Sequence, residues 1–135
     1  MVNMIESAEE FVKLRLSEDP VEYRRAANEE ALDSTWLEVI YAYPRMAGWV
    51  AHNKTVSELV MRRLSELRDS EVDMQLAMKR RTPPDILWRL AQSENESVRL
   101  TVALNPKSPR PVLELLANDE WERIRDVIQK KLVSP

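Results

Sequence analysis

Apolar residues recur every 26 positions along most of this chain. Two series keep this spacing: Met46, Val72, Val98 and Ile124, and Val50, Leu76, Val102 and Ile128. A small residue follows the second series in the same register, at Ala51, Ala77 and Ala103, which indicates a close approach of two helices. A fixed period of this length is typical of arrays whose units bury their apolar faces against one another. The sequence therefore predicts an α-solenoid with a period of 26, and we expect a right-handed one.

Helix-start signals divide each unit into two short helices. A hydroxyl precedes proline at Thr82 and at Ser108, so we expect both residues to be N-caps. Thr55 and Glu58 have the spacing of a capping box. The second helices are expected over 59–67, 86–91 and 112–117, and the first helices over 71–79, 96–104 and 122–132. With one glycine and few alternating apolar runs, the chain has no strand signal, so the predicted class is all-α.

The first 45 residues show the same helical pattern in a weaker form. Ser7 and Glu10 have the spacing of a capping box, and Asp19 precedes a proline at a second helix start. Asp33 is expected to cap a third helix. We interpret this segment as a capping helix followed by a degenerate repeat, because the terminal units of a repeat array must face water.

The expected organisation is a single domain over residues 1–135. Residues 1–45 form the cap and the degenerate repeat, and residues 46–132 form three repeats and a final helix. Charge follows the same division, because residues 1–45 hold five basic and ten acidic side chains, whereas residues 46–135 hold 15 and 13. The net charge of −3 for the whole chain argues against a dedicated nucleic-acid binder but allows a local basic stripe.

Several classes of protein are excluded by composition and hydropathy. The chain has no cysteine, which rules out disulfides, thiolate-bound metals and thiol catalysis. No apolar run approaches the ~20 residues that span a bilayer, and the first residues lack a basic region followed by an apolar block. We therefore expect a soluble, unexported protein of the cytoplasm that makes no membrane contact.

The third unit carries the most specific sequence pattern. Residues 98–109 read Val-Arg-Leu-Thr-Val-Ala-Leu-Asn-Pro-Lys-Ser-Pro, and residues 112–119 read Val-Leu-Glu-Leu-Leu-Ala-Asn-Asp. This pattern resembles the leucine-rich repeat variant family, itself similar to HEAT-like helical repeats, and the resemblance covers about residues 46–132. The second unit departs from it at Lys79, where the pattern favours asparagine. The resemblance implies a helical solenoid with binding surfaces and no fixed chemistry.

The stretch from residue 9 to residue 31 is similar to bacterial helical-repeat proteins of unknown function. This second resemblance implies no activity. It does suggest a bacterial origin for the chain.

Residue types that support catalysis are sparse. His52 is the only histidine and follows Ala51 near a predicted helix end, so we expect it at the surface. Adjacent carboxylates, such as Glu29 and Glu30, point in different directions on a helix and are expected to be solvated. One glycine cannot form a phosphate-binding loop. We therefore predict that the chain is not an enzyme and has no catalytic residues, no metal site and no cofactor.

Basic residues recur at one point of the repeat and would form a basic edge in a stacked array. They are Lys54, then Arg80 and Arg81, then Lys107, with Lys130 and Lys131 in the last unit. Acidic residues occupy the opposite turn. One interpretation is local, because basic groups favour helix C-termini and acidic groups favour N-termini. The other is that the basic edge grips phosphates or an acidic partner.

The four tryptophans have different surroundings in the sequence. Trp36 and Trp88 lie within apolar helical stripes, so we expect both in the core, and we place Trp49 with them on weaker grounds. Trp121 lies in a polar turn between repeats. It either staples the last helix or stands partly exposed as a binding anchor.

Two functions are compatible with these features. The first is a non-catalytic module that binds another protein, for example a small partner that neutralises a toxin or an enzyme. The candidate contact residues are Lys54, Arg80, Arg81, Lys107 and Trp121, with the acidic Glu29 and Glu30 facing a basic surface. The alternative is weak, salt-sensitive binding of a nucleic-acid backbone by the basic edge. A purely structural role is the third hypothesis, and we expect a monomer or a weak dimer.

Overall fold

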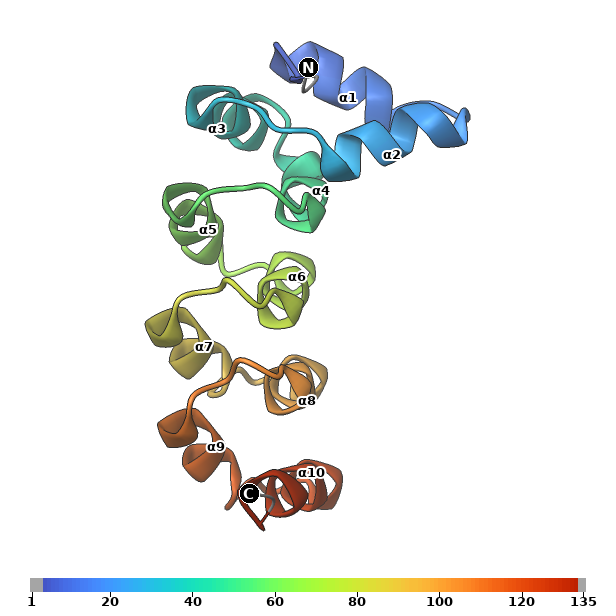
Figure 1. The fold of residues 1–135 in the computed structure, drawn as a ribbon. Helices are drawn as coiled ribbons and strands as arrows, with labels where there is room; N and C mark the ends of the chain where they lie inside the picture. Colours follow the sequence, from blue (N-terminus) through green and yellow to red (C-terminus); the bar gives the residue numbers. More distant parts are fainter. Residues whose placement is uncertain (1–3, 134–135) are drawn as a thin grey trace. The chain divides into compact units, whose positions relative to one another are not determined.

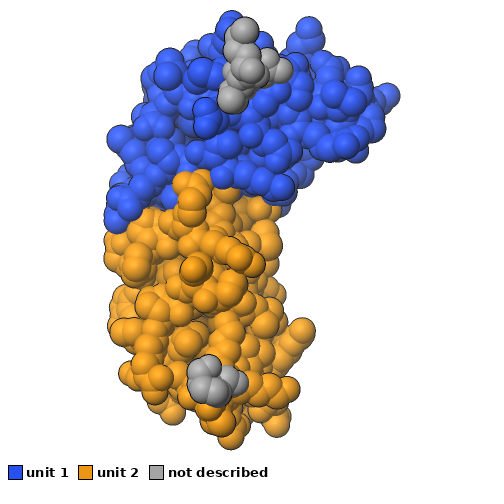
Figure 2. Space-filling model, viewed as in Figure 1, with its two compact units in different colours: residues 1–72 blue, residues 73–135 orange. Residues whose placement is uncertain are grey.

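The computed structural model describes residues 4–133, which form ten α-helices and one short 3-10 helix (Figure 1). Within these residues, extended pairing is limited to one isolated bridge between Met4 and Glu30, which confirms the predicted all-α class. The chain divides into two compact units, unit 1 (residues 1–72) and unit 2 (residues 73–135), coloured separately in Figure 2. Their formal net charges are −5 and +2. The single-domain organisation with a division at residue 45 stays a prediction.

Unit 1 is built around two buried aromatic rings. Its elements are α1 (Ala8–Leu16), α2 (Pro20–Asn28), α3 (Asp33–Ala42), η1 (Pro44–Met46), α4 (Ala47–His52) and α5 (Glu58–Ser65). Helix α1 packs against α2 and α3, and α3 packs against α4 and α5. Phe11 and Trp36 are fully buried and meet edge to face, with ring centroids 5.1 Å apart. The prediction that Trp36 belongs to the core is confirmed.

Unit 2 consists of short helices in two columns. Helix α6 (Ser70–Met78) crosses the boundary between the units and is followed by α7 (Pro84–Leu90), α8 (Glu96–Leu104), α9 (Arg110–Leu116) and α10 (Glu122–Val133). Within unit 2, α7 and α9 lie on one side and α8 and α10 on the other (Figure 1). Helix α8 packs against α7, α9 and α10.

The residues of the 26-residue series form the core of both units. The second apolar series, Val50, Leu76, Val102 and Ile128, is completely buried, and so are Ala51, Ala77 and Ala103. Burial at alanine positions leaves no room for a longer side chain, because protein interiors are close-packed.

We expect the substitution Ala103→Leu to lower the free energy of unfolding by about 1–3 kcal/mol, because it forces extra carbons into a filled space. Urea denaturation followed by circular dichroism measures this loss. Ala42→Leu is the control, since Ala42 is exposed at the end of α3. Equal unfolding midpoints for the two variants would contradict the close approach at Ala103.

Two of the predicted caps at the start of the chain are confirmed. Ser7 accepts a hydrogen bond from the amide of Glu10 at 3.0 Å and caps α1. Asp19 accepts from the amide of Val21 at 2.9 Å and caps α2, with Pro20 as the first helical residue. These side chains satisfy amides that have no partner inside the helix.

The predicted caps at Thr82 and Ser108 are wrong. Helices α7 and α9 have Pro83 and Pro109 at the N-cap position, without a side-chain cap. The two hydroxyls instead donate back into the preceding helices, Thr82 Oγ1 to the carbonyl of Leu76 at 2.6 Å and Ser108 Oγ to the carbonyl of Val102 at 2.7 Å. Carbonyls in a last helical turn lack intrahelical donors, so the buried hydroxyls serve the end of one helix rather than the start of the next.

The predictions for Thr55 and Asp33 are also wrong. Ser57, not Thr55, caps α5, because its Oγ accepts from the amide of Val60 at 3.3 Å. Thr55 Oγ1 donates to Asn53 Oδ1 at 2.6 Å. Asp33 begins α3 rather than capping it, and its carboxylate accepts from Ser57 Oγ at 2.8 Å. This bond links the first residue of α3 to the N-cap residue of α5, and Leu32 occupies the cap position of α3.

In each unit, a buried asparagine ties one helix end to a segment about 26 residues earlier. In unit 1, Asn53 Nδ2 donates to the carbonyls of Ala26 at 2.8 Å and Glu29 at 2.9 Å. In unit 2, Asn105 Nδ2 donates to the carbonyls of Ala77 at 2.8 Å and Lys79 at 2.9 Å. The same hydrogen-bonding scheme thus recurs at positions 52 residues apart. We call these contacts the asparagine ties.

Candidate binding surfaces

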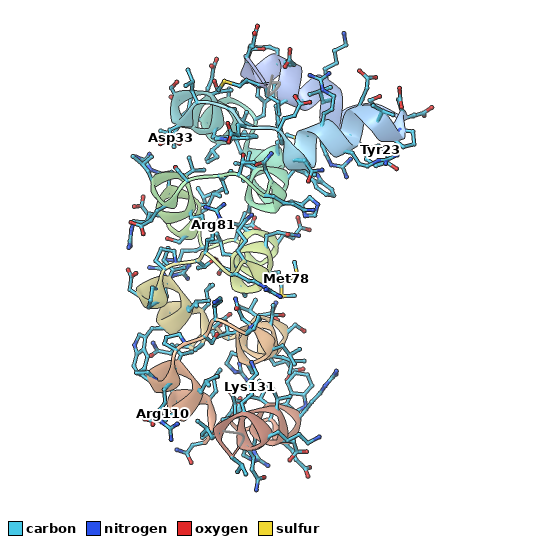
Figure 3. All side chains as sticks on the ribbon, viewed as in Figure 1. Tyr23, Asp33, Met78, Arg81, Arg110 and Lys131 are labelled. Atoms are coloured by element: carbon cyan, nitrogen blue, oxygen red, sulfur yellow. The ribbon has the colours of Figure 1, made fainter. Side chains whose placement is uncertain are left out.

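The loops of unit 2 carry three of the predicted contact residues. Arg80 and Arg81 follow α6, Lys107 follows α8, and all three are exposed. Arg81 is labelled in Figure 3. The asparagine tie at Asn105 shapes the second loop, since Asn105 Oδ1 accepts from the amide of Lys107 at 2.8 Å. The structure therefore places these three basic residues on equivalent loops of one unit.

Two exposed apolar side chains accompany the basic loops of unit 2. Met78 is 52% exposed as the last residue of α6, and Leu104 is 54% exposed as the last residue of α8. They stand 26 residues apart, two and three residues before the basic positions 80 and 107. Neither residue is among the predicted contact residues, although the period and the position just before each loop are signals that the sequence contains. We call Met78, Leu104, Arg80, Arg81 and Lys107 the mixed face.

Lys54 belongs to unit 1 and follows α4. It is exposed, and its backbone amide donates to the carbonyl of Ala27 at 2.9 Å. Lys54 belongs to unit 1, whereas Arg80, Arg81 and Lys107 belong to unit 2. A continuous basic edge through all four residues therefore remains a prediction.

Lys131 has a structural contact. Its Nζ donates to the carbonyl of Asn105 at 3.1 Å, 26 residues earlier. Burial lowers the pKa of Lys131, because it disfavours the charged ammonium group. Lys131 is a predicted member of the basic edge, and in the structure its ammonium group bonds to the end of α8.

The two acidic candidates of unit 1 differ in their surroundings. Glu29 is engaged by Arg25, whose Nε lies 2.6 Å from Glu29 Oε2, and only 14% of the Glu29 side chain is exposed. Glu30 is exposed, and its carbonyl accepts from the amide of Ile5 at 2.8 Å. Of the pair, Glu30 presents the more accessible carboxylate.

Trp121 lies half-buried at the start of α10. Its amide donates to Asp119 Oδ1 at 2.9 Å, and Arg123 lies with its guanidinium carbon 5.9 Å from the Trp121 ring centroid. Both earlier interpretations, a staple for the last helix and a partly exposed anchor, stay predictions.

A buried ion pair holds the loop that carries Trp121. Arg99 Nε donates to Asp119 Oδ2 at 2.8 Å, and Arg99 Nη1 donates to the carbonyl of Ser93 at 2.8 Å. Only 11% and 7% of the Arg99 and Asp119 side chains are exposed. The pair therefore links α8 to the loop between α9 and α10.

This ion pair shifts both titrations. Burial of the Asp119 carboxylate raises its pKa, but hydrogen bonds from Arg99 and the Trp121 amide, with the charges of Arg99 and Arg125, outweigh burial. The pKa of Asp119 therefore lies below its ordinary value. The hydrogen bond to Asp119 is the main influence that raises the pKa of Arg99.

The predictions that Trp88 and Trp49 are core residues are wrong, because their side chains are 43% and 39% exposed. In α7, Ile86, Leu87 and Leu90 are buried, whereas Trp88 is not. At about 100° per residue, position 88 falls on the side of α7 opposite to this stripe. His52 is exposed as the last residue of α4, which confirms its expected surface position.

The part of the chain described by the structure contains no group of three or more His, Asp or Glu residues placed to hold a metal ion. The helices within residues 4–133 include none with the length and hydropathy of a membrane span.

Comparison with known proteins identifies one repeat unit. The chain matches no curated protein and no solved structure. Residues 97–120, which cover most of α8, all of α9 and the loop that follows, match the family model for the leucine rich repeat variant. This segment contains Asn105, Ser108 and Asp119, whose side chains make the tie, the helix-end bond and the buried ion pair. The comparisons thus show a similarity, over residues 97–120, to the leucine rich repeat variant, a HEAT-like helical repeat family.

Proposed function

We propose that this chain is a non-catalytic helical-repeat protein that binds another protein through the mixed face of unit 2. The observation that carries the proposal is the exposure of Met78 and Leu104 at equivalent helix ends, beside the basic residues of the adjoining loops. Helical repeats commonly present extended binding surfaces of this kind. Exposed apolar side chains rimmed by polar ones are typical of protein interfaces.

The partner that fits the mixed face has an acidic surface with apolar side chains among its carboxylates. Unit 2 has a net charge of +2, and its loops present Arg80, Arg81 and Lys107. Opposite charges steer association, whereas burial of apolar groups supplies much of the affinity.

The proposal includes a right-handed α-solenoid with a period of 26. Its support is the repetition of local contacts: the asparagine ties at Asn53 and Asn105, and the hydroxyl bonds of Thr82 and Ser108. Repeated contacts of this type allow each helical repeat to pack on the preceding repeat in the same way.

The more specific features expected from the sequence belong to the same proposal. Further contact residues are Lys54, Trp121, Glu29 and Glu30, and the partner would be a toxin or an enzyme that the chain neutralises. We propose that the protein acts in the cytoplasm as a monomer or weak dimer.

Nucleic-acid backbone binding is the second candidate function. Exposed Arg80, Arg81 and Lys107 on equivalent loops favour it, because guanidinium and ammonium groups bind phosphates. Met78 and Leu104 favour the protein partner, since aliphatic side chains add nothing to phosphate binding.

Two double variants distinguish the candidates. Met78→Ser with Leu104→Ser is expected to weaken protein binding by about tenfold or more, because it removes exposed apolar area. Arg80→Glu with Arg81→Glu is expected to weaken it to a similar extent by charge reversal. Quantitative affinity capture from the native source, with wild type and variants as bait, identifies proteins that require both pairs. Fluorescence anisotropy with labelled DNA and RNA, at low and near-physiological salt, measures the alternative.

Leu59→Ser with Leu67→Ser is the matched control, since both leucines are exposed in unit 1. A protein recovered by wild type and the control, but by neither test variant, supports the proposal. Salt-sensitive nucleic-acid binding that is lost only on charge reversal supports the alternative instead. Recovery of the same proteins by all four baits contradicts a role for the mixed face.

A further inference from the structure

A pocket of about 420 Å³ opens on unit 1 where α1, α2 and α4 meet. Its polar and aromatic lining consists of Arg15 from α1, Tyr23 and Arg24 from α2, and Trp49 and His52 from α4. Tyr23 is labelled on α2 in Figure 3. The volume lies in the range of about 300–1,000 Å³ typical of small-molecule sites. The lining of this pocket comes from unit 1 alone, whereas the residues of the mixed face belong to unit 2.

Arg15 has hydrogen-bonding capacity that the protein does not use. Its guanidinium carbon lies 3.4 Å from the centroid of the Trp49 ring, so the charge is held against an aromatic face. Its Nε is buried and has no hydrogen-bond partner among residues 4–133. Buried donors normally have an acceptor, because an unsatisfied donor is destabilising. Arg15 is therefore positioned by Trp49 rather than neutralised by a carboxylate.

Arg24 is a second cation in the pocket. Its Nε donates to the carbonyl of Pro20 at 3.0 Å, and no residue between 4 and 133 forms an ion pair with it. The neighbouring Arg25, by contrast, pairs with Glu29. Unit 1 has a net charge of −5, so carboxylates are abundant in it, yet none lines this pocket.

Aromatic rings form the rest of the polar lining. The Trp49 and His52 rings meet edge to face, with centroids 5.8 Å apart. Tyr23 is 40% exposed and Trp49 is 39% exposed, so both rings are accessible. Accessible aromatic side chains stack on planar ligands, including nucleobases.

We propose that this pocket binds a small aromatic phosphate of the size of a nucleoside monophosphate. Two arginines without carboxylate partners match a phosphate monoester, which carries nearly two negative charges at neutral pH and accepts paired N–H bonds. Tyr23 and Trp49 provide surfaces for the planar ring. The two arginines come from α1 and α2, and the two rings come from α2 and α4, so three helices of unit 1 build the site.

Isothermal titration calorimetry of the full chain with adenosine 5′-monophosphate tests the proposal. Adenosine and inorganic phosphate are the partial ligands. We expect the nucleotide to bind about tenfold or more tightly than either part, because each part makes only one class of contact. Uridine 5′-monophosphate is expected to bind as well, since stacking and phosphate contacts do not depend on base identity.

The arginine variants assign the phosphate contact. Arg15→Gln and Arg24→Gln are each expected to weaken nucleotide binding by about tenfold. Lys13→Gln is the matched control, because Lys13 is exposed on α1 and does not line the pocket. Its affinity is expected to equal that of wild type. Arg24 is itself exposed, so its variant retains the fold, which circular dichroism verifies.

Three outcomes overturn the proposal. The first is no heat of binding with either nucleotide at millimolar concentration. The second is an equal loss in Lys13→Gln and Arg24→Gln, which shows only general charge attraction. The third is binding of a short single-stranded oligonucleotide without binding of the mononucleotide, which assigns the surface to a nucleic-acid strand.

Discussion

We expect the substitution Asp119→Ala to lower the free energy of unfolding by about 3–5 kcal/mol, because it leaves the Arg99 guanidinium buried without its carboxylate. Urea denaturation at neutral pH measures the loss. Glu120→Ala is the control in the same loop. Glu120 Oε1 lies 3.8 Å from Arg99 Nη2, and its side chain is 90% exposed, so its removal is expected to change stability little. Similar losses for the two variants would contradict the dominance of the buried pair.

The same pair makes stability depend on pH in the acid range. The folded pKa of Asp119 lies below the unfolded value of about 3.9, so the folded state favours the ionised carboxylate. Its stabilisation is fully present above the unfolded pKa and is lost as the pH falls through the folded pKa. The stability difference between wild type and Asp119→Asn is therefore expected to be constant near pH 6–7 and to shrink below about pH 4. A difference that grows on acidification would contradict this sign.

Replacing Asn105 with alanine is expected to lower the free energy of unfolding by about 2–4 kcal/mol. The change removes both donors to the carbonyls of Ala77 and Lys79 and the acceptor for the amide of Lys107. Asn105 is only 3% exposed, so water does not readily replace these bonds.

Asn118→Ala is the matched control, because Asn118 is exposed in the loop after α9. It is expected to shift the urea midpoint little. Asn105→Asp keeps the size of the side chain but turns a donor into an acceptor that faces carbonyl oxygens, so we expect at least the loss seen with alanine. If Asn105→Ala were as stable as Asn118→Ala, the result would contradict a stabilising role for the asparagine tie.

The helical core was predictable because burial repeats with the sequence period. Val102, Ala103 and their equivalents combine apolar character with fixed spacing, and a single sequence shows both. The caps at Thr82 and Ser108 were not predictable in the same way. A hydroxyl before proline fits either a cap for the next helix or a donor to the previous one. The choice depends on how far the loop turns back, which neighbouring residue types do not reveal.

The candidate binding surfaces could be predicted only in part. The grouping of Arg80, Arg81 and Lys107 is predictable because basic residues recur with the period. The cation–π contact between Arg15 and Trp49 has no such sequence pattern. These two residues come from helices 34 positions apart and meet only after unit 1 has folded. The position of Trp88 is hard to predict for a simpler reason: an apolar residue next to an apolar stripe in the sequence can lie on the opposite side of the helix.

The asparagine ties have a consequence for how such a protein can change. The side-chain amide of Asn105 donates to main-chain oxygens of Ala77 and Lys79, and every residue type supplies that oxygen. The tie therefore sets no requirement on exposed side chains of this segment, whereas Ala77 is restricted by its own burial. Met78, between the two carbonyls, can be exchanged for another residue without loosening the joint. The exposed helix ends can therefore change in sequence while the buried amide of Asn105 keeps the end of α8 bonded to the end of α6.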